Sequence, residues 1–179
     1  MWIERLRFAV PGEPRGKGRP RFSRAMGRAY TDTETRHYED RICIAARGAF
    51  EGKPIARAVE VRLRVLATFT RPANRYRKKD PDRGGKTSRC DLDNVIKAVA
   101  DGINAAAIWG DDSQVVEISA RKEWAAIIDR KDKTCEAPGL SVILEVWEGA
   151  PKLPYSPRAW SWCQAATSCR TRGGCGPSP

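Results

Sequence analysis

Four segments of the chain alternate hydrophobic and polar positions with the period of two that is typical of half-buried β-strands. Their apolar positions fall within residues 6–10, 59–69, 116–120 and 142–146. In the longest of them, every second residue from Val59 to Phe69 is apolar, and the positions between are largely polar. We therefore expect four strands, each with one face turned towards a core.

Two further segments have helical spacing. Thr31 stands three residues before Glu34 as a capping-box start, and apolar positions then recur from Tyr38 to Ala49. The second segment is clearer, with apolar residues at i, i+3, i+4, i+7 and i+11 and polar residues on the opposite face. The apolar stripe is Leu92, Val95, Ile96, Val99 and Ile103, and the polar face is Asp93, Lys97, Asp101 and Asn104. The pattern predicts an α+β fold: a mixed four- to five-stranded sheet with two main helices.

The end of the chain differs in composition from the rest. The 179 residues are enough for a single domain with a substantial core. Residues 150–179 hold four cations, no acid, five prolines and no hydrophobic periodicity. We expect one domain over residues 1–149 and a disordered basic tail over residues 150–179.

The charge is strongly positive and points to a polyanionic partner. The chain has 33 Lys and Arg against 22 Asp and Glu, which gives a formal net charge of +11. No apolar run is long enough for a membrane span, and the N-terminus lacks the apolar core of a secretory signal. We therefore expect a cytoplasmic protein with no membrane partner, and we interpret the six cysteines as free thiols. The spacing of Cys163, Cys169 and Cys175 in the tail matches no common zinc site.

The candidate chemistry lies in two acidic clusters. Asp91 is placed to cap the second helix with Asp93 in its first turn, and Asp111 and Asp112 precede the strand near residues 114–120. Helix capping and an exposed Asp93–Lys97 pair worth ~0.3–0.5 kcal/mol would explain the first cluster alone. If three carboxylates met within ~4 Å, each pair would repel by roughly 4 kcal/mol at a dielectric of about 20, so the cluster would need a cation.

Carboxylates alone favour Mg²⁺, with Mn²⁺ as an alternative, over zinc. In a protein that attracts phosphates, such an ion suggests hydrolysis of phosphodiester bonds. Lys97 would then stabilise the charge that builds up on the phosphate. Asp101, one turn further along, would hold Lys97 in position or only solvate the helix face.

The stretch Asp91–Asn104 with its D-x-D-N-x-x-K-x-x-x-D pattern, followed by Trp109–Val116, resembles the RusA family of Holliday junction resolvases, found in bacteria and prophages. The resemblance runs from about Phe8 to Lys122. It implies that Asp91, Asp93 and Asp112 bind the metal and that Lys97 is an essential basic residue. It also implies a homodimer that resolves DNA four-way junctions with Mg²⁺, in the DNA recombination and repair of a bacterial or phage-infected cell.

Two basic segments are candidate DNA contacts. Arg15, Lys17, Arg19 and Arg21 occupy alternate positions, so in an extended chain they would form a ladder with a spacing of about 6.6 Å along one side. A mobile, solvated loop is the other interpretation of this segment. The second segment runs from Arg71 to Arg89, and its composition indicates a flexible arm. Its candidate contacts are Lys78, Lys79, Lys86 and Arg89, and Lys122, which matches a lysine of the family, is a further candidate.

Three other interpretations fit parts of the sequence. Asp40 with Glu51 and Lys53 loosely resembles a restriction-type nuclease motif, but these residues fall in a helix and the turn after it. A non-catalytic protein that binds branched or single-stranded DNA would use the cations and aromatic residues such as Phe22. It would have no use for clustered carboxylates. An RNA-binding factor would explain the charge and leave the acidic spacing unexplained.

Overall fold

The computed structural model describes residues 1–149 apart from residues 20, 25, 26 and 31, and it describes only the backbone of Arg21, Ser23 and Tyr30. The tail predicted over residues 150–179, with its cysteines, lies outside the described residues. The described part has the predicted α+β fold, with a mixed five-stranded sheet and two main helices. No helix in this part is long and apolar enough to cross a membrane.

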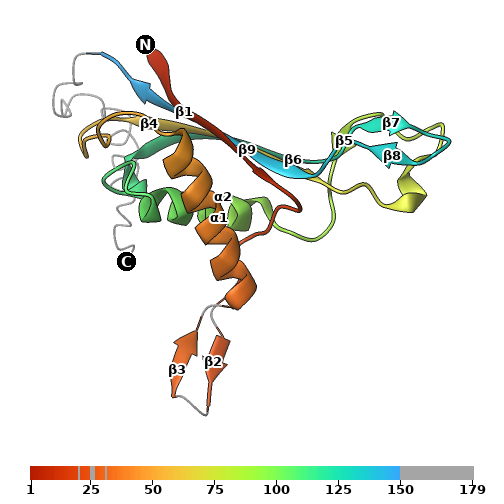
Figure 1. Ribbon diagram of the computed structural model, residues 1–179, viewed down its shortest axis with the longest axis horizontal. Coiled ribbons are helices and arrows are strands. Elements are labelled where there is room, and N and C mark those ends of the chain that lie inside the picture. The colour runs from red at the N-terminus through yellow and green to blue at the C-terminus, as the bar shows by residue number, and fades with distance from the viewer. Residues whose placement is uncertain (20, 25–26, 31, 150–179) are drawn as a thin grey trace, which may run out of the picture. The chain divides into compact units, whose positions relative to one another are not determined.

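The central sheet has the strand order β1-β9-β4-β6-β5 (Figure 1). Its strands are β1 (Trp2–Pro11), β4 (Val61–Phe69), β5 (Gly84–Gly85), β6 (Val115–Trp124) and β9 (Gly139–Trp147). β9 is antiparallel to both β1 and β4, whereas β4 and β6 are parallel. All four predicted strands are present, and β5, too short to give a periodic signal, is the fifth.

The register of the sheet collects the alternating apolar residues into rows on one face. Phe8 lies opposite Val142, and Val142 lies opposite Val65 on the other side. Leu6, Leu144 and Leu63 form the next row in the same way. Because side chains alternate between faces along a strand, the arginines at positions 62 and 64 of β4 point to the opposite face.

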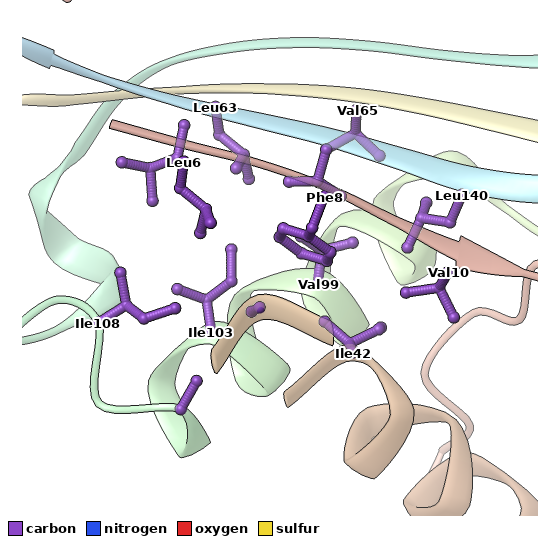
Figure 2. Close-up of a cluster of buried hydrophobic side chains, with 14 of the residues drawn as sticks. Leu6, Phe8, Val10, Ile42, Leu63, Val65, Val99, Ile103, Ile108 and Leu140 are labelled. Atoms are coloured by element: carbon purple, nitrogen blue, oxygen red, sulfur yellow. The ribbon is translucent and has the colours of Figure 1, made fainter. Parts of the chain in front are cut away.

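Both main helices cover this apolar face (Figure 1). They are α1 (Thr33–Ala49) and α2 (Leu92–Ala105). Ile42 of α1 and Val99 and Ile103 of α2 are fully buried among the side chains of β1, β4 and β9 (Figure 2). The two predicted stripes are therefore the surfaces that pack on the sheet.

The helix starts differ in detail from those expected. The residue before α1 is Asp32, whose side chain makes no capping hydrogen bond, and Thr31 lies outside the described residues. Asp91 occupies the N-cap of α2 as predicted, and it too makes no side-chain capping bond. Its carboxylate is therefore available for other contacts.

Two small hairpins were not predicted. β2 (Arg21–Ser23) and β3 (Arg28–Tyr30) pair beyond the N-terminal end of α1, and β7 (Ile127–Asp129) pairs with β8 (Thr134–Cys135) (Figure 1). Single 3₁₀ turns occur at η1 (Ala73–Arg75) and η2 (Asp112–Gln114). Three or fewer residues per strand give too few alternations for the period of two to be recognised.

The close approach of the two helices at Gly102 predicts a measurable effect on stability. A Cβ atom at Gly102 would lie 2.5 Å from Ile42 Cγ2 and 3.2 Å from the Glu39 carbonyl oxygen. We expect Gly102→Ala to lower the free energy of unfolding by about 1–3 kcal/mol, because the helices must move apart. Gly48→Ala in α1, where a Cβ would meet nothing within 4 Å, is the matched control in urea unfolding. It should be neutral or stabilise by up to ~1 kcal/mol; equal effects of the two substitutions would contradict this account.

Candidate active site

A groove of about 400 Å³ lies between α2 and β6. Charged side chains from three separate segments line it: Lys17, Lys97 and Asp101 with Asp112. Apolar side chains form its floor, among them Ile96 of α2 and Ile118 of β6. The half-exposed Ile118 lies where, among the described strands, β6 has no partner on its outer side, since β5 pairs only with Glu123 and Trp124. The groove is thus an open surface beside a free strand edge.

The exposed face of α2 supplies the first charges. Asp93, Lys97 and Asp101 are four residues apart, so they follow one face of the helix while its apolar stripe packs on the sheet. The ammonium of Lys97 donates to Asp93 Oδ2 over 3.1 Å. This hydrogen bond lowers the pKa of Asp93, which is therefore ionised to lower pH than an isolated aspartate.

The turn before β6 separates the roles of the two neighbouring aspartates. Asp111 Oδ1 accepts the Ser113 N–H, and Gln114 completes a capping box by accepting the Asp111 N–H. Hydrogen bonding to Ser113 lowers the pKa of Asp111. The buried Gln114 also donates to the carbonyls of Ala56 and Val59, which fixes the turn. Asp111 thus has a structural contact, and Asp112 is the aspartate that borders the groove.

Lys17 crosses from the first basic segment to α2. Its ammonium forms an ion pair with Asp101, which raises the pKa of Lys17, and Glu39 and Asp112 act in the same direction at longer range. Glu39 is half-buried, and burial followed by the charge of Asp101 raises its pKa. No pattern in the sequence points to Glu39, because only the packing of α1 on α2 brings it near Asp101.

The backbone of the first basic segment is docked on the start of α2. The Lys17 N–H donates to the Asn94 carbonyl over 2.8 Å. A Cβ at Gly16 would lie 2.9 Å from Asn94 Cβ, so only glycine fits at this approach. The mobile, solvated loop is therefore wrong for this part of the segment, and Lys17 of the expected ladder is paired with Asp101 in the structure. Arg15 forms an ion pair with Glu34, Arg19 is exposed, and the side chain of Arg21 is not described.

The predicted metal ligands are only partly brought together. Asp112 and Lys97 both line the groove, and Lys97 forms an ion pair with Asp93. Asp91 is an exposed residue ahead of the helix and is not part of the groove lining. Within the described residues, no three Asp, Glu, His or Cys side chains lie close enough to hold a metal ion. The donor atoms are all carboxylate oxygens, which suit a hard divalent cation in chemistry. The three-carboxylate site remains a prediction.

The second basic segment is not the flexible arm that its composition indicated. The buried Arg71 donates to the carbonyls of Ala125, Arg75 and Asp82. Arg83 forms ion pairs with Glu123 and Glu136. These contacts hold the segment against the end of the sheet, and the candidate DNA contacts that are exposed are Lys78, Lys79 and Arg89. Lys86 and Lys122 face the backbone of the same segment instead of solvent.

Comparison with known proteins assigns the chain to a family. The family described as Endodeoxyribonuclease RusA matches residues 11–130, which is more than half of the chain and includes every groove residue named above. The chain belongs to the RusA family. An uncharacterized protein of Bacillus subtilis (strain 168), YqaN, is 28% identical over 123 residues, covering 65% of this chain and 86% of YqaN.

RusA membership confirms the resemblance inferred from the sequence and makes the protein an endodeoxyribonuclease, a hydrolase of DNA phosphodiester bonds. It decides against the non-catalytic DNA-binding alternative and the RNA-binding one. The RusA match ends at residue 130, so β8 and β9 lie outside it.

The Asp93–Lys97 contact predicts a change in titration. Lys97→Met should raise the pKa of Asp93 towards that of an isolated aspartate, because the hydrogen bond that favours its ionised form is lost. Carboxyl-carbon NMR titration measures this directly. The pKa of Asp111, lowered by Ser113, should not move and serves as the internal control. An unchanged pKa of Asp93 would show that the ion pair does not form in solution.

Proposed function

We propose that this RusA protein is a Mg²⁺-dependent, structure-selective endonuclease that resolves Holliday junctions by paired cuts. The observation that supports the proposal most directly is the groove in which Asp112 lies beside Lys97, itself bonded to Asp93. A carboxylate and a cation on facing elements, open to solvent at a free strand edge, can receive a phosphodiester. Family membership supports action on DNA.

The residues around the groove would have different roles in hydrolysis. Lys97 is exposed and one helical turn from Asp93, so its ammonium can approach a phosphate oxygen and offset the negative charge that develops there. Asp101 holds Lys17 at the edge of the groove, where a second cation lowers the repulsion between DNA and the carboxylates. Asp112 is fixed in position by the capped turn on which it stands.

Asp91, Asp93 and Asp112 are the residues that we propose would hold the metal. Bound Mg²⁺ would supply a more acidic water and stabilise the departing oxygen. Asp93 is paired with Lys97 in the structure, so metal binding there requires this pair to loosen. Loosening the pair costs little free energy, because both side chains are more than 60% exposed and exposed ion pairs contribute little to stability.

A homodimer suits the proposed substrate. A twofold protein presents two equivalent sites, and a four-way junction presents two equivalent strands. The exposed cations Arg19, Lys78, Lys79 and Arg89 would contact phosphates along the arms. We place this activity in the recombination and repair of DNA in the cytoplasm of a bacterial or phage-infected cell.

Cleavage of a synthetic four-way junction tests the proposal. We expect paired nicks with Mg²⁺ and none with EDTA. Asp93→Asn and Asp112→Asn should lower the rate by more than about a hundredfold, since even supporting residues of metal sites contribute 10–100-fold, while junction binding is retained. Asp111→Asn is the matched control and should cleave normally, because asparagine also caps a helical turn. Cleavage in EDTA would refute the metal mechanism, and single unpaired nicks would count against the homodimer.

The exposed Arg19 predicts a change in salt dependence. Arg19→Ala should weaken junction binding and reduce the slope of log affinity against log salt by about one, as expected for one lost phosphate contact. Arg5→Ala, an exposed arginine of β1, is the comparison and should leave the slope unchanged. An unchanged slope for Arg19→Ala would mean that this segment does not reach the DNA backbone.

A further inference from the structure

Two lysines that the sequence offers as candidate DNA contacts, the buried Lys86 and the half-buried Lys122, donate hydrogen bonds to the backbone of the protein. Lys86 is only 8% exposed, and its ammonium lies 4.4 Å from the centroid of the Phe69 ring and 5.2 Å from that of Trp124. Aromatic faces at these distances attract a cation. Burial, followed by the nearby charge of Lys122, lowers the pKa of Lys86. A lysine in this position cannot reach the phosphate of a bound nucleic acid without leaving its site.

The ammonium groups of both lysines bind the backbone just before α2. Lys86 Nζ donates to the carbonyls of Ser88 and Arg89. Lys122 Nζ donates to the carbonyl of Ser88 over 3.1 Å and to that of Cys90 over 2.8 Å. Three consecutive carbonyl groups are therefore held by two cations. An ammonium group has three donors, so most of the hydrogen-bonding capacity of each lysine is used inside the protein.

The sheet fixes where these two cations lie. Lys122 pairs with Ala67 of β4 and Trp124 pairs with Phe69, so both residues stand on the helix-covered face near the end of the sheet. The Lys86 N–H donates to the Lys122 carbonyl over 3.2 Å, which joins the segment to β6 directly. The carbonyls of Ser88–Cys90 are thus held, through Lys86 and Lys122, against β6 of the central sheet.

Cys90 shows that this stretch of backbone is constrained. Its φ of 79° lies in the left-handed region that non-glycine residues rarely adopt. Lys122 binds its carbonyl, and its half-buried thiol lies beside Gly16, where a Cβ would come within 3.5 Å of the sulfur. An unusual backbone conformation persists only where the surroundings hold it, and such positions concentrate at functional sites. The next residue is Asp91, the N-cap of α2.

We propose that Lys86 and Lys122 are positioning residues, which hold the backbone of Ser88–Cys90 and thereby orient the Asp91 carboxylate for metal binding. This inference rests on the proposed function, which makes Asp91 a metal ligand. It assigns Lys86 and Lys122 a role different from the DNA contact proposed for the exposed Lys78, Lys79 and Arg89. All five residues contribute to the positive net charge of the chain.

Lys122→Met tests the inference, because it keeps the aliphatic stem and removes the ammonium. We expect wild-type junction affinity and salt slope in EDTA, and single-turnover cleavage at saturating protein slower by at least about tenfold. The Mg²⁺ concentration for half-maximal rate should rise. Hydrogen exchange of the backbone amides in residues 88–94 should be faster. Lys131→Met, an exposed lysine in the turn after β7, is the matched control and should behave as the wild type.

The outcomes are separable. Weaker junction binding with a reduced salt slope and a normal saturated rate would make Lys122 a phosphate contact and overturn the inference. A normal Mg²⁺ dependence with unchanged amide exchange would also overturn it. If the wild type fails to cleave junctions, the proposed function fails, and amide exchange still decides whether Lys122 holds this backbone. Lys122→Gln, which replaces the ammonium by a shorter, neutral amide with two N–H donors, serves if the Met variant does not fold. Because the charge that binds the carbonyls of Ser88 and Cys90 is lost in it, wild-type exchange and Mg²⁺ dependence would overturn the inference.

Discussion

The packing of one face of α2 on the sheet is the constraint on which the site depends. Val95, Val99 and Ile103 are fully buried, and this fixes the rotation of the helix about its axis. Once that rotation is fixed, the residues on the opposite face have no freedom to point elsewhere. The charged groove is therefore a consequence of burying the apolar stripe, and Gly102 permits the close contact with α1 that keeps α2 in place.

Charge compensation is the second requirement that the fold meets around the groove. Asp101 and Asp112 line the groove, and the charge of Asp101 acts on the half-buried Glu39 and helps to raise its pKa. Lys97 and Lys17 offset carboxylate charge, each through a contact with a different aspartate. Lys17 reaches the groove only because the segment before β2 crosses the start of α2, so a loop distant in the sequence completes the charge balance of the helix.

Periodicity was sufficient to predict the long elements, whereas the contacts of the charged residues depended on tertiary structure. The stripes of α2 and β4 contain enough repeats to be unambiguous, and the family pattern singled out Asp91, Asp93, Lys97 and Asp112 as candidate site residues. The two-residue strand β5 has too few positions for any repeat. The pairing of Lys17 with Asp101 joins residues 84 positions apart, and no local pattern encodes it. Alternating cations before β2 were consistent with an extended ladder or a mobile loop, whereas Gly16 allows the backbone to dock on the helix.

Net charge describes a sequence, whereas attraction of DNA depends on which cations reach the surface. In the segment from Arg71 to Arg89, the buried Arg71 and Lys86 bind backbone carbonyls, and Arg83 is paired with acids. The contacts of these inward cations hold a segment that contains several glycine and proline residues against the end of the sheet. Lys86 holds the carbonyl of Arg89, whose exposed side chain stands two residues before Asp91. The inward cations therefore hold the backbone that leads from the exposed Arg89 to Asp91 at the start of α2, which a flexible arm could not do.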